Sequence, residues 1–358
     1  MWAWTWIKSA LGQTGQAAGR MHGSGPAYHG GVEQRDLGGT GLRVSALGFG
    51  CGAVGGLMVR GDRDEQTRAV ARALDAGISY FDTAPSYGSG ASEKNVGRAL
   101  AELGAWDRAV VGTKVRFGPA DFHEPRAAIR RSLEASLERL GRDSVDILHV
   151  HNPIGIVERE HDGVLGLAQV LGDVATGLNE VIAAGLVRHA GFTGVGDAVA
   201  LRETVMAGPF ATVQSYFNVF NPSAGYTGHS GGQQDFQGLI DTAARVGAGV
   251  IAIRVLAAGA ATGSAERPTN AADPGPALVS GWQYDGDRER ALSLAPLAAQ
   301  LGLEGPLELA VRFALAKAGV STVLVGYSTL EHLESAIRWA ERGPLPDAAV
   351  RQLVQLAS

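Results

Sequence analysis

Beyond residue 34, the chain alternates between two patterns of apolar and polar positions. In the first pattern, apolar residues recur every three to four positions, as the buried face of an amphipathic helix requires. Most of these segments begin with an acidic residue or proline and end at glycine, which are helix start and stop signals. They predict helices at 62–77, 124–141, 173–185, 196–208, 330–343 and 346–357.

In the second pattern, short apolar runs lack the polar alternation of strands that are exposed on one face. Such runs are typical of parallel strands, which helices cover on both sides of the sheet. Eight runs are present, at 44–50, 78–83, 109–114, 145–151, 187–193, 211–216, 249–256 and 320–326. Eight strands alternating with helices within about 300 residues predict an α/β fold, the closed (β/α)8 TIM barrel, rather than an open doubly wound sheet.

The start of the chain lies outside this alternation. A glycine-rich turn joins two short apolar pieces in 35–47 and predicts an N-terminal β-hairpin that caps the bottom of the barrel. Residues 1–33 contain three tryptophans followed by Gly, Ala, Ser and Gln, without the uninterrupted apolar core of a secretory signal. We expect a disordered extension there, with a membrane-surface anchor or translation from Met21 as alternatives. Residues 34–358 are expected to form a single barrel domain.

Composition narrows the possible functions. The 358 residues carry a net charge of -5, which argues against a basic nucleic-acid surface. No run approaches the roughly 18 apolar residues of a membrane span. The single cysteine, Cys51, fits a reducing compartment and argues against a cysteine-based zinc site. We therefore expect a cytoplasmic protein without a metal, a nucleic-acid partner or a membrane partner, and its oligomeric state stays open.

Three segments exceed the usual length of a connection within a compact domain, and such loops are usually functional. They follow the fourth, sixth and seventh predicted strands, at 153–172, 219–235 and 260–286. In a (β/α)8 barrel these positions share the face at the carboxyl ends of the strands, where barrel enzymes hold their active sites.

Four polar residues are expected at that face. Asp82 ends the second strand, Tyr87 follows in a glycine-rich loop, and Lys114 and His151 end the third and fourth strands. Because these strands are neighbours in the barrel, the four side chains can converge. A capped turn and a packed ring would also explain Asp82 and Tyr87, and a lysine at a strand end can form a Schiff base.

The four residue types suit the reduction of a carbonyl group. A tyrosine has an ordinary pKa of about 10, and a neighbouring ammonium lowers that pKa. A carboxylate holds the ammonium charged, and a histidine can donate a second hydrogen bond to the substrate oxygen. None of these side chains carries electrons, so the hydride must come from a bound cofactor.

The motifs around these residues resemble those of the aldo-keto reductases. The stretch FDTAPSYGSGASEKNVGRAL, at 81–100, is similar to the family's F-D-T-A-x-x-Y-G segment and the S-E-x-x-G-x-A-L that follows it. VVGTKV and VDILHVHNP resemble the strand ends that carry the family's lysine and histidine, and the resemblance covers about residues 34–341. It implies four catalytic residues: Asp82, Tyr87, Lys114 and His151.

The resemblance also implies a nicotinamide-cofactor site. The residues that map to it are Gly50, Cys51, Thr193, Gln214, Arg254, Leu256, Gly259, Gly326, Ser328 and His332. In the family, a serine, an asparagine and a glutamine bind the nicotinamide carboxamide. Here Thr193 can supply the hydroxyl, Gly194 replaces the asparagine, and Gln214 matches the glutamine.

Other positions depart from the family pattern. Ile253 replaces an aromatic residue that stacks on nicotinamide, and Arg254 replaces a serine and is a candidate contact of the pyrophosphate. Ser328 stands where a basic residue usually binds the 2′-phosphate of NADP, which leaves His332 as the nearby basic candidate. Ala336 replaces an adenine-binding asparagine. NADP(H) is therefore favoured over NAD(H) as the cofactor only because it is the usual cofactor of the family that the chain resembles.

The expected function is the NAD(P)(H)-dependent reduction of an aldehyde or ketone, or the reverse oxidation of an alcohol or sugar. Three alternatives stay open. They are an NAD-dependent sugar or alcohol dehydrogenase, a non-catalytic cofactor-binding subunit like the potassium-channel beta subunits, and a lyase or aldolase that uses Lys114 as a Schiff base. The sequence does not identify the small-molecule substrate, because the three long loops that would line its pocket carry no recognisable motif.

Overall fold

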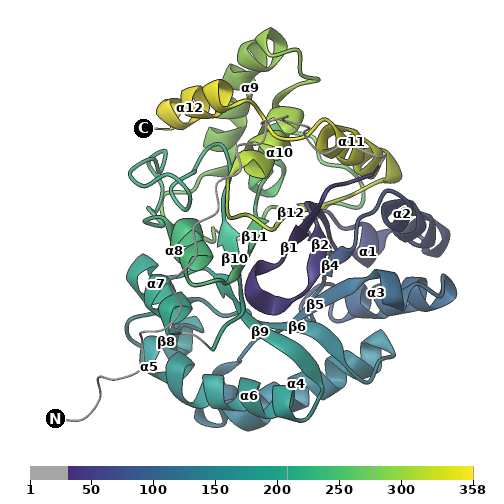
Figure 1. Ribbon diagram of the computed structural model, residues 1–358, viewed down its shortest axis with the longest axis vertical. Coiled ribbons are helices and arrows are strands. Elements are labelled where there is room, and N and C mark those ends of the chain that lie inside the picture. The colour runs from purple at the N-terminus through teal and green to yellow at the C-terminus, as the bar shows by residue number, and fades with distance from the viewer. Residues whose placement is uncertain (1–30, 208, 276, 358) are drawn as a thin grey trace, which may run out of the picture. The chain divides into compact units, whose positions relative to one another are not determined.

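A ring of eight parallel strands forms the centre of the protein in a computed structural model, which describes residues 31–207, 209–275 and 277–357. The strands are β3 (Leu47–Gly50), β4 (Tyr80–Asp82), β5 (Val110–Val115), β6 (Val145–Val150), β9 (Val187–Gly194), β10 (Thr212–Tyr216), β11 (Gly249–Ile253) and β12 (Thr322–Gly326). Each strand pairs with the next, and β12 pairs with β3, so the ring closes (Figure 1). This arrangement confirms the predicted (β/α)8 barrel.

Helices surround the ring of strands (Figure 1). They are α1 (Leu57–Arg60), α2 (Arg63–Asp75), α3 (Ala91–Glu102), α4 (Pro125–Leu140), α5 (Leu167–Gln169), α6 (Ala175–Ala183), α7 (Ala198–Met206), α8 (Leu239–Arg245), α9 (Tyr284–Gln300), α10 (Pro306–Ala316), α11 (Leu330–Glu341) and α12 (Asp347–Leu356). The Asp62 carboxylate accepts a hydrogen bond from the Glu65 N–H at 2.8 Å and caps α2. Gly141 ends α4 with a φ of 68°. Both devices satisfy backbone groups that a helix leaves unpaired at its ends.

The predicted β-hairpin closes one end of the barrel. Strands β1 (Gln34–Asp36) and β2 (Arg43–Ser45) pair antiparallel, and the turn between them places Leu37 in a buried cluster with residues of β4, β6 and β11. Gly38 is required in this turn, because its φ is 54° and a Cβ atom would lie 2.3 Å from the Gly249 nitrogen. Since Gly249 begins β11, the hairpin lies at the amino-terminal ends of the strands.

The long connections extend from the opposite ends of the strands. The first of them, 153–172, contains a short parallel pair, β7 (Ile154–Gly155) and β8 (Leu165–Gly166). In the connection after β11, the Asn270 side-chain amide donates a hydrogen bond to the Ser328 carbonyl at 3.0 Å. This contact ties the connection to the end of β12, so it runs along one side of the barrel mouth.

The predicted N-terminal extension lies mostly outside the described residues. Residues 1–30 belong to that part, so the expectation of disorder over 1–33 stays a prediction. Gly31–Ser358 form one compact unit. Among the helices that the structure describes, none has the length and apolar character needed to cross a membrane.

Replacing Leu37 with alanine should destabilise the barrel. Leu37 is completely buried, and the truncation would leave a cavity in a packed cluster. We expect the free energy of unfolding, measured by urea denaturation, to fall by about 2–5 kcal/mol. The matched variant Leu356→Ala, at a position that is 60% exposed, should lose less than about 0.5 kcal/mol. Equal losses in the two variants would contradict a packing role for the hairpin.

Candidate active site

The four predicted catalytic residues come together at the carboxyl ends of β4, β5 and β6. Asp82 is the last residue of β4, Tyr87 lies in the turn after it, Lys114 lies near the end of β5, and His151 follows β6. The Lys114 ammonium donates hydrogen bonds to the Asp82 carboxylate and, at 2.8 Å, to the Thr83 carbonyl. The Lys114 and Asp82 side chains are only 1% and 3% exposed, so the ion pair is buried.

Burial and charge act in opposite directions on this pair. Burial raises the pKa of Asp82, and the charge of Lys114 opposes that shift. Burial acts to lower the pKa of Lys114, but the charges of Asp82 and Tyr87 and the hydrogen bonds to both together outweigh burial, so the pKa of Lys114 is raised. The lysine therefore stays protonated at neutral pH and provides a fixed positive charge beneath the barrel mouth.

The Tyr87 ring lies close to both Lys114 and His151. The Lys114 Nζ atom is 4.8 Å from the centre of the Tyr87 ring, and the Tyr87 and His151 ring centres are 6.0 Å apart with an interplanar angle of 87°. Burial raises the pKa of Tyr87, while the charge of Lys114 acts to lower it. The predicted effect of Lys114 is thus present, but burial outweighs it. The phenol stays protonated, as a proton donor must.

The glycine-rich sequence after Tyr87 forms the turn that holds this ring. Gly88, Ser89 and Gly90 have φ angles of 61°, 53° and 87°, a left-handed region that favours glycine. A Cβ atom on Gly88 would also lie 2.4 Å from a Val59 methyl group. The turn reverses the chain between β4 and α3, which leaves Tyr87 at the barrel mouth.

Ser92 and Glu93 position the strands that carry the ion pair. The Ser92 hydroxyl shares a hydrogen bond at 2.8 Å with the hydroxyl of Thr83, directly after Asp82. The buried Glu93 carboxylate accepts a hydrogen bond at 2.5 Å from the hydroxyl of Thr113, directly before the lysine. The S-E pair of the S-E-x-x-G motif therefore has a positioning role, which the residue types alone did not reveal.

Two histidines at the end of β6 differ in their surroundings. Burial lowers the pKa of both His149 and His151 well below the usual range, and the charge of Lys114 adds to the effect. The His149 Nε2 atom shares a hydrogen bond with the Thr212 hydroxyl at 3.1 Å, so His149 belongs to the barrel interior. His151 lies next to Tyr87, where a neutral imidazole can donate one N–H to a substrate oxygen.

Three of the predicted cofactor residues lie beside Asp82 on adjoining strand ends. Gly50, at the end of β3, is paired with Asp82 on one side and with Gly326 on the other. Cys51 follows Gly50 and is buried, and burial raises the pKa of its thiol well above the usual value. The thiol is therefore protonated and unreactive, which agrees with a lining role rather than a nucleophilic one.

Thr193 and Gln214 form a second pair of predicted cofactor residues. They are opposite each other on β9 and β10, and the Thr193 hydroxyl donates to the Gln214 side-chain carbonyl at 3.2 Å. The Gln214 amide also donates to the Asp82 carboxylate. A carboxamide-binding pair would need such amide and hydroxyl groups, so these residues fit the predicted role. The link from Gln214 to Asp82 was not predicted, because nothing in the sequence places these two side chains together.

The remaining cofactor candidates follow β11 and β12. Arg254, Leu256 and Gly259 lie in the segment directly after β11, and Gly259 has a φ of 99°. Ser328 is buried just before α11, and His332 lies in the first turn of that helix, where desolvation of its ring lowers its pKa. Of these groups, Ser328 and His332 provide little positive charge for a 2′-phosphate.

The loop after β3 contains a G-x-G-x-x-G spacing, formed by Gly50, Gly52 and Gly55. The helix after it, α1, has only 4 residues, unlike the long helix of a dinucleotide-binding βαβ unit. A Cβ atom on Gly52 would contact the Tyr87 ring at 3.6 Å, and one on Gly55 would lie 2.6 Å from the Tyr327 nitrogen. These glycines allow the loop after β3 to pass close to Tyr87 and to the end of β12.

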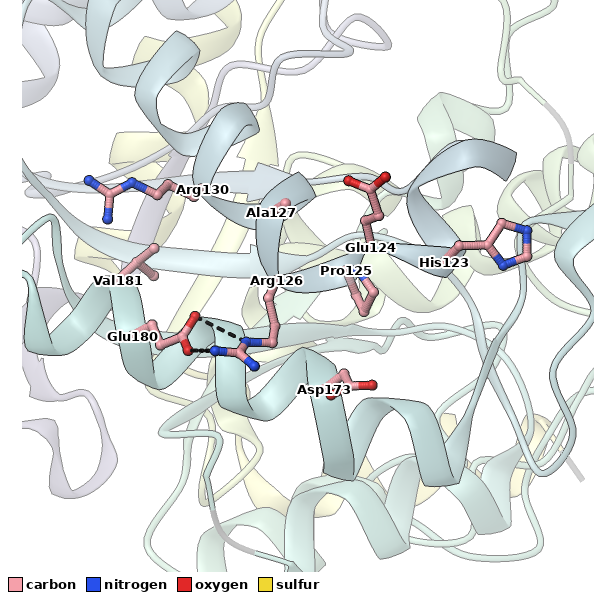
Figure 2. Close-up of a pocket in the computed structure, with 9 residues that line it drawn as sticks. All are labelled: His123, Glu124, Pro125, Arg126, Ala127, Arg130, Asp173, Glu180 and Val181. Carbon is pink, nitrogen blue, oxygen red and sulfur yellow. Dashed lines mark hydrogen bonds and ion pairs between the residues drawn. The ribbon is translucent and has the colours of Figure 1, made fainter.

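A surface pocket of about 480 Å³ lies between α4 and α6 (Figure 2). None of the predicted site residues lines it. Arg126 and Glu180 form an ion pair at this pocket, so these two charges are already compensated (Figure 2). Within the described ranges, no three His, Cys, Asp or Glu side chains group as a metal site would need. The chemistry is therefore concentrated at the barrel mouth.

Comparisons with known proteins place the chain in a family. The model of the Aldo/keto reductase family matches residues 46–358. The chain is 28% identical to L-galactose dehydrogenase of Arabidopsis thaliana over 310 residues, which are 86% of this chain and 87% of that protein. It is 33% identical to aldo-keto reductase YhdN of Bacillus subtilis over 196 residues, which are 53% of this chain and only 55% of the Bacillus protein.

A solved structure shares the fold. The holo form of aldo-keto reductase AKR11C1 from Bacillus halodurans matches with a TM-score of 0.66 and 23% identity, covering 91% of this chain and 96% of that one. The family match shows that the chain belongs to the aldo/keto reductase family. The solved structure shares its barrel fold.

Replacing His149 with glutamine should make the protein less sensitive to acid. His149 is neutral in the folded state but can be protonated when unfolded, below its ordinary pKa of about 6.5. The unfolded state then binds more protons, so the stability is complete above this pH and falls as the pH decreases. We expect the wild-type protein to lose about 1.4 kcal/mol more than His149→Gln between pH 7.5 and pH 5.5, measured by urea denaturation. An equal loss in both proteins would show that His149 does not titrate on unfolding.

Proposed function

We propose that this protein reduces an aldehyde or ketone to an alcohol with a nicotinamide cofactor, or catalyses the reverse oxidation. The observation that carries the proposal is the buried Asp82–Lys114 ion pair, which lies next to the ring of Tyr87 with His151 on its other side. When a carbonyl carbon is reduced, its oxygen must gain a proton. A tyrosine beside a fixed ammonium can donate that proton, because the ammonium stabilises the phenolate that is left.

In this proposal, Tyr87 donates its proton to the carbonyl oxygen. Lys114 stabilises the phenolate that is left, and Asp82 holds Lys114 charged and oriented. The neutral His151 donates a second hydrogen bond to the same oxygen and orients the substrate. In the reverse direction, the phenolate accepts the proton of an alcohol.

The nicotinamide cofactor would supply the hydride when bound. Thr193 and Gln214 would hold the carboxamide of the nicotinamide, as their adjacent hydroxyl and amide groups suggest. Gly50, Cys51 and Gly326 would line the path of the cofactor along the strand ends. Other candidate contacts are Leu256, Gly259, Ser328 and His332. Family habit favours NADP(H), and a cytoplasmic location stays a prediction from the single cysteine.

An NAD-dependent sugar or alcohol dehydrogenase is the second candidate. Ser328 offers no positive charge, and the lowered pKa of His332 leaves that ring neutral at pH 7, so the described residues at the start of α11 favour a 2′-phosphate only weakly. The relative that aligns over 86% of this chain bears the name of a sugar dehydrogenase, L-galactose dehydrogenase.

Replacing Tyr87 with phenylalanine should remove the proton donor and leave the ring in place. We expect kcat for a simple aldehyde to fall by about 10²- to 10⁴-fold, while the cofactor dissociation constant changes little. Absorbance of the reduced nicotinamide follows turnover, and tryptophan fluorescence follows binding. The matched variant Tyr226→Phe, whose ring packs beside Phe217 and Phe313, should keep its activity. Wild-type turnover in Tyr87→Phe would refute the mechanism.

Fluorescence titration with NADPH and NADH in parallel tests the cofactor assignment. We expect NADPH to bind more tightly by less than about tenfold, because a neutral His332 offers the 2′-phosphate at most one uncharged hydrogen bond. His332→Ala should weaken the binding of NADPH and leave that of NADH unchanged. Tighter binding of NADH would favour the NAD-dependent dehydrogenase. Binding of neither cofactor would remove the hydride source and contradict both functions.

A further inference from the structure

Arg254 is a positive charge at the barrel mouth without a counterion. It directly follows β11, and its side chain is only partly exposed. Among the described residues, its guanidinium donates one hydrogen bond, to the Pro274 carbonyl at 3.3 Å. No carboxylate of the described residues pairs with it, although 22 ion pairs occur elsewhere in the same part of the chain. Most of its N–H donors are therefore available to a ligand.

The backbone at Arg254 is held in an unusual conformation. Its φ is 58°, in the left-handed region that residues other than glycine seldom adopt. The Asn218 side-chain amide donates a hydrogen bond to the Arg254 carbonyl at 3.0 Å and fixes this conformation. Asn218 is itself held by the backbone N–H groups of Phe220 and Asn221, at 3.0 Å and 2.9 Å. Such strain persists where surrounding contacts enforce it, and it is concentrated at functional sites.

Arg254 directly follows Ile253, which pairs in register with Tyr216 across β10 and β11. The positive charge of Arg254 acts to lower the pKa of Tyr87 and also that of Tyr216, the last residue of β10. Burial of the guanidinium lowers its own pKa, and the two tyrosines oppose this shift. The charge of Arg254 therefore acts on Tyr87, the proposed proton donor, from the carboxyl end of β11.

A partly buried cation without a counterion is unfavourable unless a ligand compensates it. Arginine binds planar anions through two parallel hydrogen bonds, which suits a carboxylate. Tyr87, the proposed proton donor, lies at the same barrel mouth, so an anion on Arg254 would be held at the face where the carbonyl reacts. The cofactor pyrophosphate offers the same anionic chemistry, and Arg254 is a candidate contact of it by position in the sequence, so the experiment has to separate these two anions.

We infer that Arg254 binds a carboxylate of the substrate, and that this protein acts on carbonyl compounds that carry a carboxylate group. The inference rests on the proposed function and specifies its substrate class. Arg254 would select and orient the substrate, while Tyr87 and His151 act on its carbonyl oxygen.

A pair of aldehydes that differ only in charge tests the inference. We would measure kcat/KM for 4-carboxybenzaldehyde and for its neutral methyl ester, together with the dissociation constants of NADPH and NADH. The wild-type protein should prefer the acid by about tenfold or more, because a charged hydrogen bond contributes that much. In Arg254→Gln this acid-to-ester ratio should fall by about 10- to 100-fold. Arg254→Lys, which keeps the charge but loses the two-pronged geometry, should be intermediate.

A matched arginine variant serves as the control for Arg254→Gln. Arg245→Gln removes an equal charge from an exposed position at the end of α8 and should change no measured value. Equal losses on both aldehydes with weaker cofactor binding would assign Arg254 to the pyrophosphate and overturn the inference. If the wild-type protein prefers the ester, the inference is overturned. This measurement needs no variant, so it decides the question even if Arg254→Gln does not fold. Turnover of neither aldehyde would count against the proposed function itself.

Discussion

The buried ion pair between Lys114 and Asp82 is the interaction on which the site depends. Two charges inside a barrel lose the solvation of water, and their mutual attraction only partly restores it. Such a pair is therefore weak evidence for stability and better evidence for a function that needs a charge at that place. Here the charge is next to a tyrosine, and it opposes the effect of burial on the pKa of that tyrosine.

The barrel brings this pair together and holds it in place. Asp82 and Lys114 are 32 positions apart in the chain, yet they lie on adjoining strands whose carboxyl ends meet at one face. Hydrogen bonds that Ser92 shares with Thr83 and that Glu93 accepts from Thr113 then fix the neighbouring residues of both strands. Asp82 and Lys114 are thus positioned by regular strands, and the glycine-rich turn after β4 adds Tyr87.

Much of the fold could be predicted because the helices and strands have clear local patterns. All eight strands were recognisable as short apolar runs, since each is buried by the barrel core and by helices, and Asp62 and Gly141 mark helix ends through their capping chemistry. Helix α9 was not delimited, because its apolar positions are weakly periodic and it contains Pro296. The course of the long loop before it also stayed unknown, since contacts such as that between Asn270 and Ser328 join segments far apart in the chain.

The sequence by itself determined the class of fold, the order of its elements and the identity of the four residues at the strand ends, because these depend on local periodicity and on a motif that is continuous in the chain. The tertiary structure alone decided which groups touch. It linked Gln214 to Asp82, left His149 inside the barrel, and gave Arg254 no carboxylate partner within the described residues. Burial, charge and pKa arise from neighbours brought together by closure of the ring, and no local pattern in the chain encodes them.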